Sequence, residues 1–271
     1  MTESNLLADG EEEILEAVLA TVDGDLYVVS PSGELVEALV SVAADAAERP
    51  TVRLLADDSV LKSVMEEFVV ASTVADLVEM EDLSVRTLDA DADDNALVVT
   101  PTSVLSIVSA GDRVAALSTD DASFVDTARD SYEARFEAAP EFGFRTPPLS
   151  RVRETLAAEI GEATRDDFDA ALESLDGSDG AGLDEVTISL LVAARNEVLL
   201  YDISKWGEDV GIASKATFSR TKTRLEDRGL IATEKVPIDV GRPRLRLKLG
   251  DDRLREASAD ELVDVARSLL D

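Results

Sequence analysis

Residues 184–249 read DEVTISLLVAARNEVLLYDISKWGEDVGIASKATFSRTKTRLEDRGLIATEKVPIDVGRPRLRLKL, and the spacing of their apolar side chains determines the fold that we predict here. The periodicity predicts helices over 184–196, 199–210 and 214–228, followed by two strands joined by a loop. Helix, turn, helix and β-hairpin, in this order, is the layout of a winged helix-turn-helix domain.

Local signals agree with this layout. Ser214 is a natural N-cap for the third helix, and Gly229 stands where the end of that helix needs a positive φ. Pro237 and Pro243 mark the loop of the hairpin, and RLRLKL (244–249) alternates charged and apolar residues as a half-exposed strand does.

The charge of this segment is opposite to that of the rest. The chain has 271 residues and a net charge of −32, with 58 acidic and 26 basic residues. Between Lys205 and Lys248, however, eleven basic residues accompany six acidic ones, so this segment carries +5 and the remainder −37. A positive island in so negative a chain predicts an anionic partner, although an ordinary basic surface and a protein-binding winged helix remain alternatives.

Double-stranded DNA is the partner that best suits this island. A helix in the major groove needs donors on its exposed face, and a cationic hairpin suits phosphates or the minor groove. The predicted DNA-binding residues lie on the third helix and the hairpin: Ser214, Lys215, Thr217, Ser219, Arg220, Thr221, Arg224, Arg242, Arg244, Arg246 and Lys248.

The first part of the chain alternates helical and strand patterns, which predicts an α/β domain with a partly parallel sheet. Strands are expected at 25–30, 51–56, 85–89, 96–100, 104–109 and 113–119. Helices are expected at 11–22, 31–46, from 58 to about 80, and 121–139. The predicted fold class is therefore an α/β amino-terminal domain plus a mainly α carboxyl-terminal winged helix-turn-helix domain.

We predict four parts in the chain. An α/β effector-binding or dimerisation domain (1–140) precedes a linker with connecting helices (141–183), then the winged helix-turn-helix (184–250) and a carboxyl-terminal segment (251–271). The last segment holds an amphipathic helix that packs on its own domain or pairs with a second subunit.

An effector site is expected where strands end and helices begin, because free N–H groups and hydroxyls at such loops suit a phosphate. Arginines on or beside the strands would supply charge. The predicted effector-binding residues are Ser30, Ser32, Gly33, Arg53, Arg86, Arg113, Ser118 and Thr119.

Composition narrows the possible chemistry. The chain has no Cys and no His, which excludes thiolate nucleophiles, Ser–His pairs and Cys/His zinc sites. We predict no catalytic residue, no metal site and no enzymatic activity, although a carboxylate–Mg²⁺ or Ser-based enzyme is not excluded. The apolar runs are too short to span a bilayer and the start lacks signal-peptide features, so a soluble cytoplasmic protein is expected.

The stretch SKATFSRTKTRLEDRGLI (214–231) resembles the recognition helix of MarR-, ArsR- and TrmB-like winged-helix regulators through Thr217, Phe218, Ser219-Arg220 and Leu225-Glu226. Lys222 departs from this pattern, because such helices commonly carry an aliphatic residue there. Its stem is expected along the edge of the core, with the ammonium group reaching outward, unless the helix is slightly rotated.

The acidic, Lys-poor composition resembles that of haloarchaeal cytoplasmic proteins, and the whole arrangement resembles the haloarchaeal TbsP-like transcriptional regulators. That resemblance implies a homodimeric regulator, such as a repressor, of central carbon and sugar metabolism. It implies modulation by a phosphorylated sugar such as fructose 1,6-bisphosphate, and another regulator of the TrmB type as a partner. The alternative is a metabolite-sensing interaction protein whose winged helix binds another regulator rather than DNA.

Overall fold

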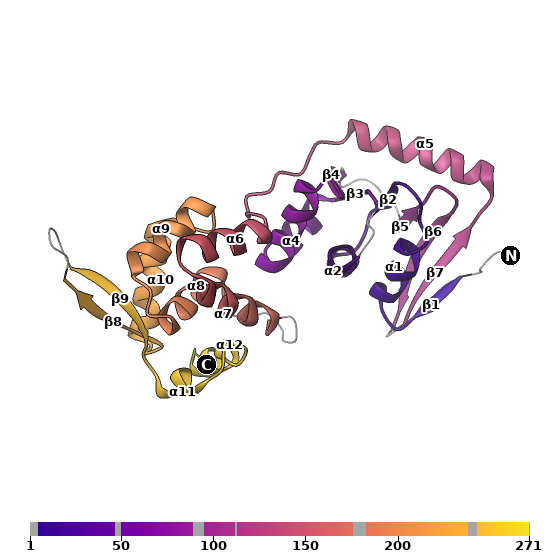
Figure 1. Cartoon of the computed structure of the whole chain (residues 1–271). Coiled ribbons are helices and arrows are strands. Elements are labelled where there is room, and N and C mark those ends of the chain that lie inside the picture. The colour runs from indigo at the N-terminus through magenta and orange to yellow at the C-terminus, as the bar shows by residue number, and fades with distance from the viewer. Residues whose placement is uncertain are drawn as a thin grey trace. The chain divides into compact units, whose positions relative to one another are not determined.

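The computed structural model consists of two compact units, Met1–Phe144 and Arg145–Asp271 (Figure 1). It describes residues 5–46, 50–88, 95–111, 113–175, 183–237 and 243–270. The four-part division predicted from the sequence stays a prediction, and each compact unit is considered by itself below.

The first unit is built on a mixed sheet with the strand order β1-β7-β6-β5-β2-β3-β4 in the described residues. Its strands are β1 (Leu6–Ala8), β2 (Leu26–Val29), β3 (Val52–Asp57), β4 (Leu83–Leu88), β5 (Leu97–Val99), β6 (Val104–Ala110) and β7 (Arg113–Thr119). β2, β3 and β4 are parallel, whereas β5, β6, β7 and β1 each run antiparallel to their neighbours. The partly parallel sheet predicted from the sequence is confirmed.

Helices cover the two faces of this sheet unequally. They are α1 (Glu11–Leu19), α2 (Gly33–Asp45), α3 (Asp58–Val64), α4 (Phe68–Glu79) and α5 (Ala122–Ala138). Side chains of α1 to α4 form the large core with one face, and α5 alone among the described helices packs on the other face, through Val125 and Phe136 (Figure 1). The single helix predicted from 58 to about 80 is in fact two helices, and no glycine or proline marks the break.

The second unit contains the predicted winged helix-turn-helix. Its helices are α6 (Leu149–Glu159), α7 (Glu162–Glu173), α8 (Glu185–Arg195), α9 (Leu200–Val210), α10 (Lys215–Asp227), α11 (Asp252–Glu256) and α12 (Leu262–Leu270). The antiparallel hairpin consists of β8 (Ile231–Val236) and β9 (Arg244–Leu249). A single bridge between Leu199 and Arg246 adds the stretch before α9 to the free edge of β9.

Small residues and caps set the geometry of the helix-turn-helix. Ser214 caps α10 by accepting a hydrogen bond from the N–H of Thr217 at 3.2 Å, as predicted. Gly211 ends α9 with φ +98°, and this left-handed residue produces the tight turn between the two helices. Gly207 of α9 lies against the ring of Phe218, where a Cβ would come within 2.3 Å of Cζ. The two helices therefore cross at close range.

Buried side chains hold the rest of the unit around this pair. Trp206 of α9 is fully buried and donates a hydrogen bond from Nε1 to Oγ1 of Thr155 in α6 at 3.0 Å. Leu262, Val263 and Ala266 of α12 are buried as well. Of the two placements expected for the last helix, the structure has the packing on its own unit.

Candidate nucleic-acid interface

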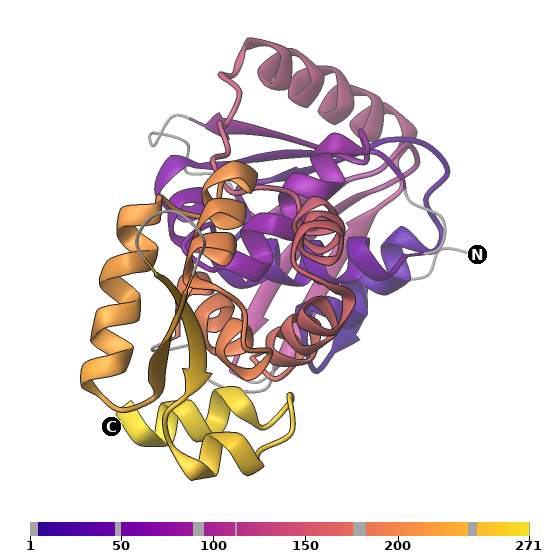
Figure 2. The same ribbon diagram turned by 60° about the vertical axis from the view of Figure 1, so that its left-hand side comes forward.

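The helix α10 has two distinct faces. Phe218, Thr221 and Leu225 are buried and anchor it to the unit. Six exposed residues at helical spacing form the opposite face, which we call the reading face: Ala216, Ser219, Arg220, Thr223, Arg224 and, in the last turn, Asp227. Figure 2 shows α10 at the outside of its unit, with the hairpin beside it.

Arg220 occupies the centre of the reading face. It donates a long hydrogen bond from Nη2 to Oγ1 of Thr217 at 3.4 Å. In the described residues no carboxylate lies within ion-pair distance of it. The guanidinium can therefore turn toward a base edge or a phosphate without breaking an internal ion pair.

Arg224 follows one turn later and is held only loosely. It donates a hydrogen bond to Oγ1 of Thr187 at 3.1 Å and lies 3.7 Å from a carboxylate oxygen of Asp184. Its side chain remains 57% exposed. Such a long, exposed ion pair contributes little, so Arg224 can exchange it for a phosphate.

Two predicted contacts at the start of α10 have internal roles. Ser214 is the N-cap, and Lys215 forms an ion pair with Glu208 of α9. The hydrogen bond between the last two groups lowers the pKa of Glu208 and raises the pKa of Lys215. Both residues thus fix the helix-turn-helix geometry, and binding a phosphate at Lys215 would compete with Glu208.

Two residues of α10 face inward. Thr221, predicted to contact DNA, is only 7% exposed, so the structure removes it from the reading face because it lies one turn from Phe218 on the buried side. Lys222 has a side chain that is 12% exposed and pairs with Glu226 at 2.8 Å, in keeping with a stem along the core edge. Hydrogen bonds from Lys222 and Thr233 lower the pKa of Glu226.

The three cations of β9 share one face of the hairpin, and each has a partner. Arg244 lies 3.3 Å from a carboxylate oxygen of Asp202, and its guanidinium carbon is 4.5 Å from the centre of the Tyr201 ring. Both partners belong to α9. The side chain is 40% exposed, so it is paired without being buried.

Arg246 and Lys248 surround Glu197, at 3.9 and 3.8 Å, and Lys248 also pairs with Glu234 at 2.9 Å. The bonds to Glu234 and Glu197 raise the pKa of Lys248. Arg242, also predicted to contact DNA, lies outside the described residues. The positive island is therefore largely neutralised on the hairpin and open on α10, a difference that the sequence does not reveal because it depends on which carboxylates the fold brings close.

The predicted effector residues do not meet in one place. Ser30, Ser32 and Gly33 follow the carboxyl end of β2, where Ser32 caps α2. Ser118 and Thr119 lie at the end of β7, which runs antiparallel to β2 through the intervening β5 and β6. Thr119 is level with Tyr27, near the start of β2, so the two groups lie toward opposite ends of the strands with β5 and β6 between them.

Of the three predicted effector arginines, Arg53 and Arg86 lie over the same ring, that of Phe136, whereas Arg113 lies on β7; each of the three has a structural role. Arg53 pairs with Asp25 at 3.1 Å. Arg86 donates to backbone oxygens at the end of α5 at 2.9 to 3.1 Å, which satisfies carbonyls that the helix leaves open. Arg113 pairs with Asp9 at 2.9 Å. The predicted effector cluster therefore does not assemble.

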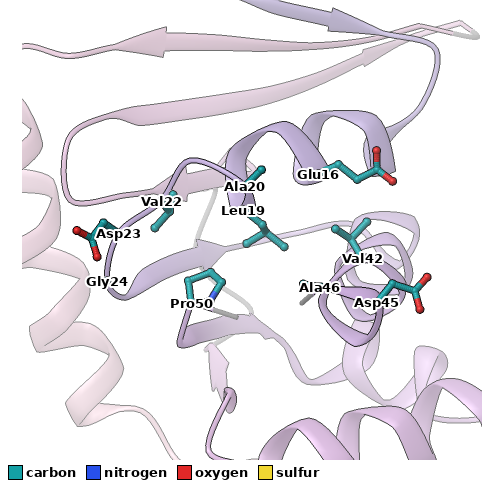
Figure 3. A pocket seen from close by; sticks show the side chains of 10 residues that line it. All are labelled: Glu16, Leu19, Ala20, Val22, Asp23, Gly24, Val42, Asp45, Ala46 and Pro50. Atoms are coloured by element: carbon teal, nitrogen blue, oxygen red, sulfur yellow. The ribbon is translucent and has the colours of Figure 1, made fainter. Parts of the chain in front are cut away.

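A pocket of about 590 Å³ opens in the first unit beside the ends of α1 and α2 (Figure 3). Its lining includes the carboxylates of Glu16, Asp23 and Asp45, and none of the described residues that line it is basic. Two helix carboxyl ends add partial negative charge. An anionic sugar phosphate would be repelled from this pocket.

Two further searches concern other kinds of site. Within the described ranges, no group of three or more His, Cys, Asp or Glu side chains could hold a metal ion. Over the same residues, none of the helices is long and apolar enough to cross a membrane.

Three helices with a tight turn before the third, followed by a two-stranded wing, define the second unit as a winged helix-turn-helix domain. The comparison with protein families agrees with this fold and extends over both units. The model of the N-terminal domain of TbsP-like transcriptional regulators matches residues 3–147, and the model of their C-terminal HTH domain matches residues 148–267. The chain belongs to the family of TbsP-like transcriptional regulators, which are DNA-binding regulators.

Similarity to solved structures is distant, and no curated protein matched the sequence. TrmBL2, an archaeal chromatin protein, has a TM-score of 0.37 at 13% identity, over 52% of this chain and 54% of its own. This chain thus spans about half the length of that protein. NucT from Helicobacter pylori (TM-score 0.38, 15% identity) covers 51% of this chain and 98% of its own. Nuc from Salmonella typhimurium, a phospholipase D family member (0.36, 8%), covers 51% and 97%.

Proposed function

We propose that this regulator binds double-stranded DNA sequence-specifically, with the reading face of α10 in the major groove. The observation that carries the proposal is the state of Arg220, which is exposed and has no carboxylate partner in the described part of the chain. A guanidinium in this state suits bidentate bonding to O6 and N7 of a guanine. Ala216, one turn earlier, and Ser219, the preceding residue, are small enough to let the helix backbone approach the bases.

In this proposal the hairpin contributes less to DNA binding than α10 does. Arg244, Arg246 and Lys248 reach phosphates only by exchanging internal carboxylates for them. Such an exchange adds little net affinity. Base contacts made by α10 therefore contribute more to DNA binding than phosphate contacts made by the wing.

The test is a comparison of DNA affinity among variants of the full chain. Arg220→Ala should weaken binding to a selected operator by about 1–3 kcal/mol, or roughly five- to a hundredfold, and relax the base preference at one position. Arg253→Ala is the matched control, because it removes the same charge from the exposed surface of α11. Equal affinities of the wild type and Arg220→Ala would contradict the proposal.

We also propose, on the family resemblance, that the targets belong to central carbon metabolism and that a phosphorylated sugar modulates binding. The positions of Arg53, Arg86 and Arg113 do not support a site made from them. The same affinity measurement, repeated with fructose 1,6-bisphosphate on DNA from upstream of sugar-metabolism genes, tests this. An affinity that the sugar phosphate leaves unchanged would contradict modulation by that compound.

A second candidate function is docking of another regulator through the winged helix. The observation that favours it is the pairing of the hairpin cations with Glu197, Asp202 and Glu234, which leaves this face with little net charge. The Arg220→Ala comparison separates the two functions, since docking predicts no sequence-dependent DNA affinity to lose.

A further inference from the structure

Three neighbouring strands of the first unit are almost free of charge. β1, β6 and β7 contain 17 residues, of which only Arg113 is charged, in a chain where 31% of residues are charged. One face of these strands packs on α1. Burial in the core of the unit therefore does not explain why the other face of these strands lacks charge.

That other face is apolar and exposed. Leu7, Val108 and Leu117 are 63%, 44% and 49% exposed, and Ala115 pairs with both Leu7 and Val108 across the strands. We call Leu7, Val108, Ala115 and Leu117 the open sheet face. Phe124, in the first turn of α5 on the same side of the sheet, is 54% exposed.

The helix α5 covers this half of the sheet only at the start of β6, where Val104 belongs to the same buried cluster. Its buried side chains, Val125 and Phe136, pack with Tyr27, Leu55 and Val99 of β2, β3 and β5. Four of the six large apolar side chains that are exposed in the described residues are Leu7, Val108, Leu117 and Phe124. Exposed apolar side chains gathered in this way mark an interaction surface.

We propose that the open sheet face binds the same face of a second copy of this chain. Electrostatic repulsion restricts the surfaces through which two copies can meet. Two bodies of charge −32 repel each other, and an isologous contact is tolerable only where neither copy presents carboxylates. The open sheet face itself contains no acidic residue, and the carboxylate of Asp9 beside it pairs with Arg113 at 2.9 Å. A basic partner, in contrast, would be attracted to the acidic surface elsewhere and would gain nothing from an uncharged face.

Two other observations favour a second copy as the occupant. The apolar side of α12, the alternative dimerisation element, is already buried in its own unit. A helix-turn-helix protein also needs two copies to read two half-sites, a point that rests on the proposed function. Because apolar contact does not weaken with salt while repulsion is screened, the dimer should tighten as salt rises.

Sedimentation equilibrium of the full chain tests the proposal, in about 0.1 M and about 2 M KCl. We expect a dimer whose dissociation constant falls with salt. Leu117→Glu should raise that constant at least about tenfold, because each dimer would bury two unpaired carboxylates. Met80→Glu is the matched control, since Met80 is 50% exposed and lies at the end of α4, away from the open sheet face.

A monomeric wild type in both salts, or a Leu117→Glu variant that dimerises as well as Met80→Glu, would overturn the proposal. Circular dichroism of both variants shows that they are folded. This result can be separated from the proposal of DNA binding. A dimer that binds no DNA would contradict only the DNA proposal, and a monomer that binds DNA would contradict only the dimer proposal.

Discussion

Glu197 shows how much one residue can decide in this domain. It adopts a positive φ of 53° after α8 and faces both Arg246 and Lys248 of the hairpin. If the wing contacts DNA as proposed, this carboxylate competes with a phosphate for the two cations. The wing is thus held in competition with DNA by an acidic residue of its own domain.

Replacing that carboxylate should release the wing. In Glu197→Gln we expect DNA affinity to rise about fivefold, because Arg246 and Lys248 each lose an ion-pair partner. Gln has nearly the same size as Glu, so the packing at position 197 is kept. The slope of log K against log salt should steepen by about 1–2, since each new phosphate contact adds about 0.9. Fluorescence anisotropy titrations at several salt concentrations measure both.

Glu256→Gln is the control for the loss of one negative charge, because Glu256 is exposed at the end of α11. An equal gain in both variants would mean that only the net charge of the chain matters.

At the scale of elements, the contact between α9 and α10 leaves no room for a larger side chain at position 207. Ala is a better helix former than Gly, yet at position 207 its Cβ would come within 2.3 Å of Cζ of Phe218, which is itself fully buried. The close approach of the two helices thus requires glycine.

We expect Gly207→Ala to lower the free energy of unfolding by about 1–3 kcal/mol, because overpacking exceeds the gain in helix propensity. Gly143→Ala is the control, since nothing lies within 4 Å of the added Cβ there. Urea denaturation followed by circular dichroism measures both. A Gly207→Ala variant as stable as the wild type would show that α10 can move away without cost.

Elements with strong local signals were predictable from the sequence. Ser214 caps α10 and Gly229 has φ +74°, as their chemistry indicates. The three-residue β1 was not predicted, because it is defined by pairing with β7 and not by its own pattern. α11 was missed for a similar reason: it has five residues, too few for a helical periodicity.

The candidate site was predictable only in part. Helical spacing places Ser219, Arg220 and Arg224 on one exposed face. The same spacing could have excluded Thr221, which lies three residues after Phe218 and four before Leu225 and so belongs to the buried face. The effector prediction depended on strand direction. The sheet reverses at β5, which separates Ser118 from Ser30, and no residue pattern encodes that reversal.

At the scale of the whole molecule, the charge of −32 opposes compactness. Many carboxylates are exposed and unneutralised, since the chain has 58 acidic and 26 basic residues. We expect the free energy of unfolding to increase when KCl is raised from about 0.1 to about 1 M, because the screening length falls from about 10 to about 3 Å. Thermal unfolding in matched buffers checks this, and a melting temperature that falls with KCl would contradict it.

The buried Trp206 gives the molecule an internal reporter. It is the only tryptophan of the chain, and it is enclosed between α9 and α6 in the second unit. Indole emission therefore arises from the helix-turn-helix half alone, whereas far-ultraviolet dichroism averages over both halves. If the two signals change at different denaturant concentrations, the first and second units unfold as separate cooperative blocks. A ligand of the first unit can then be recognised by which of the two curves it moves.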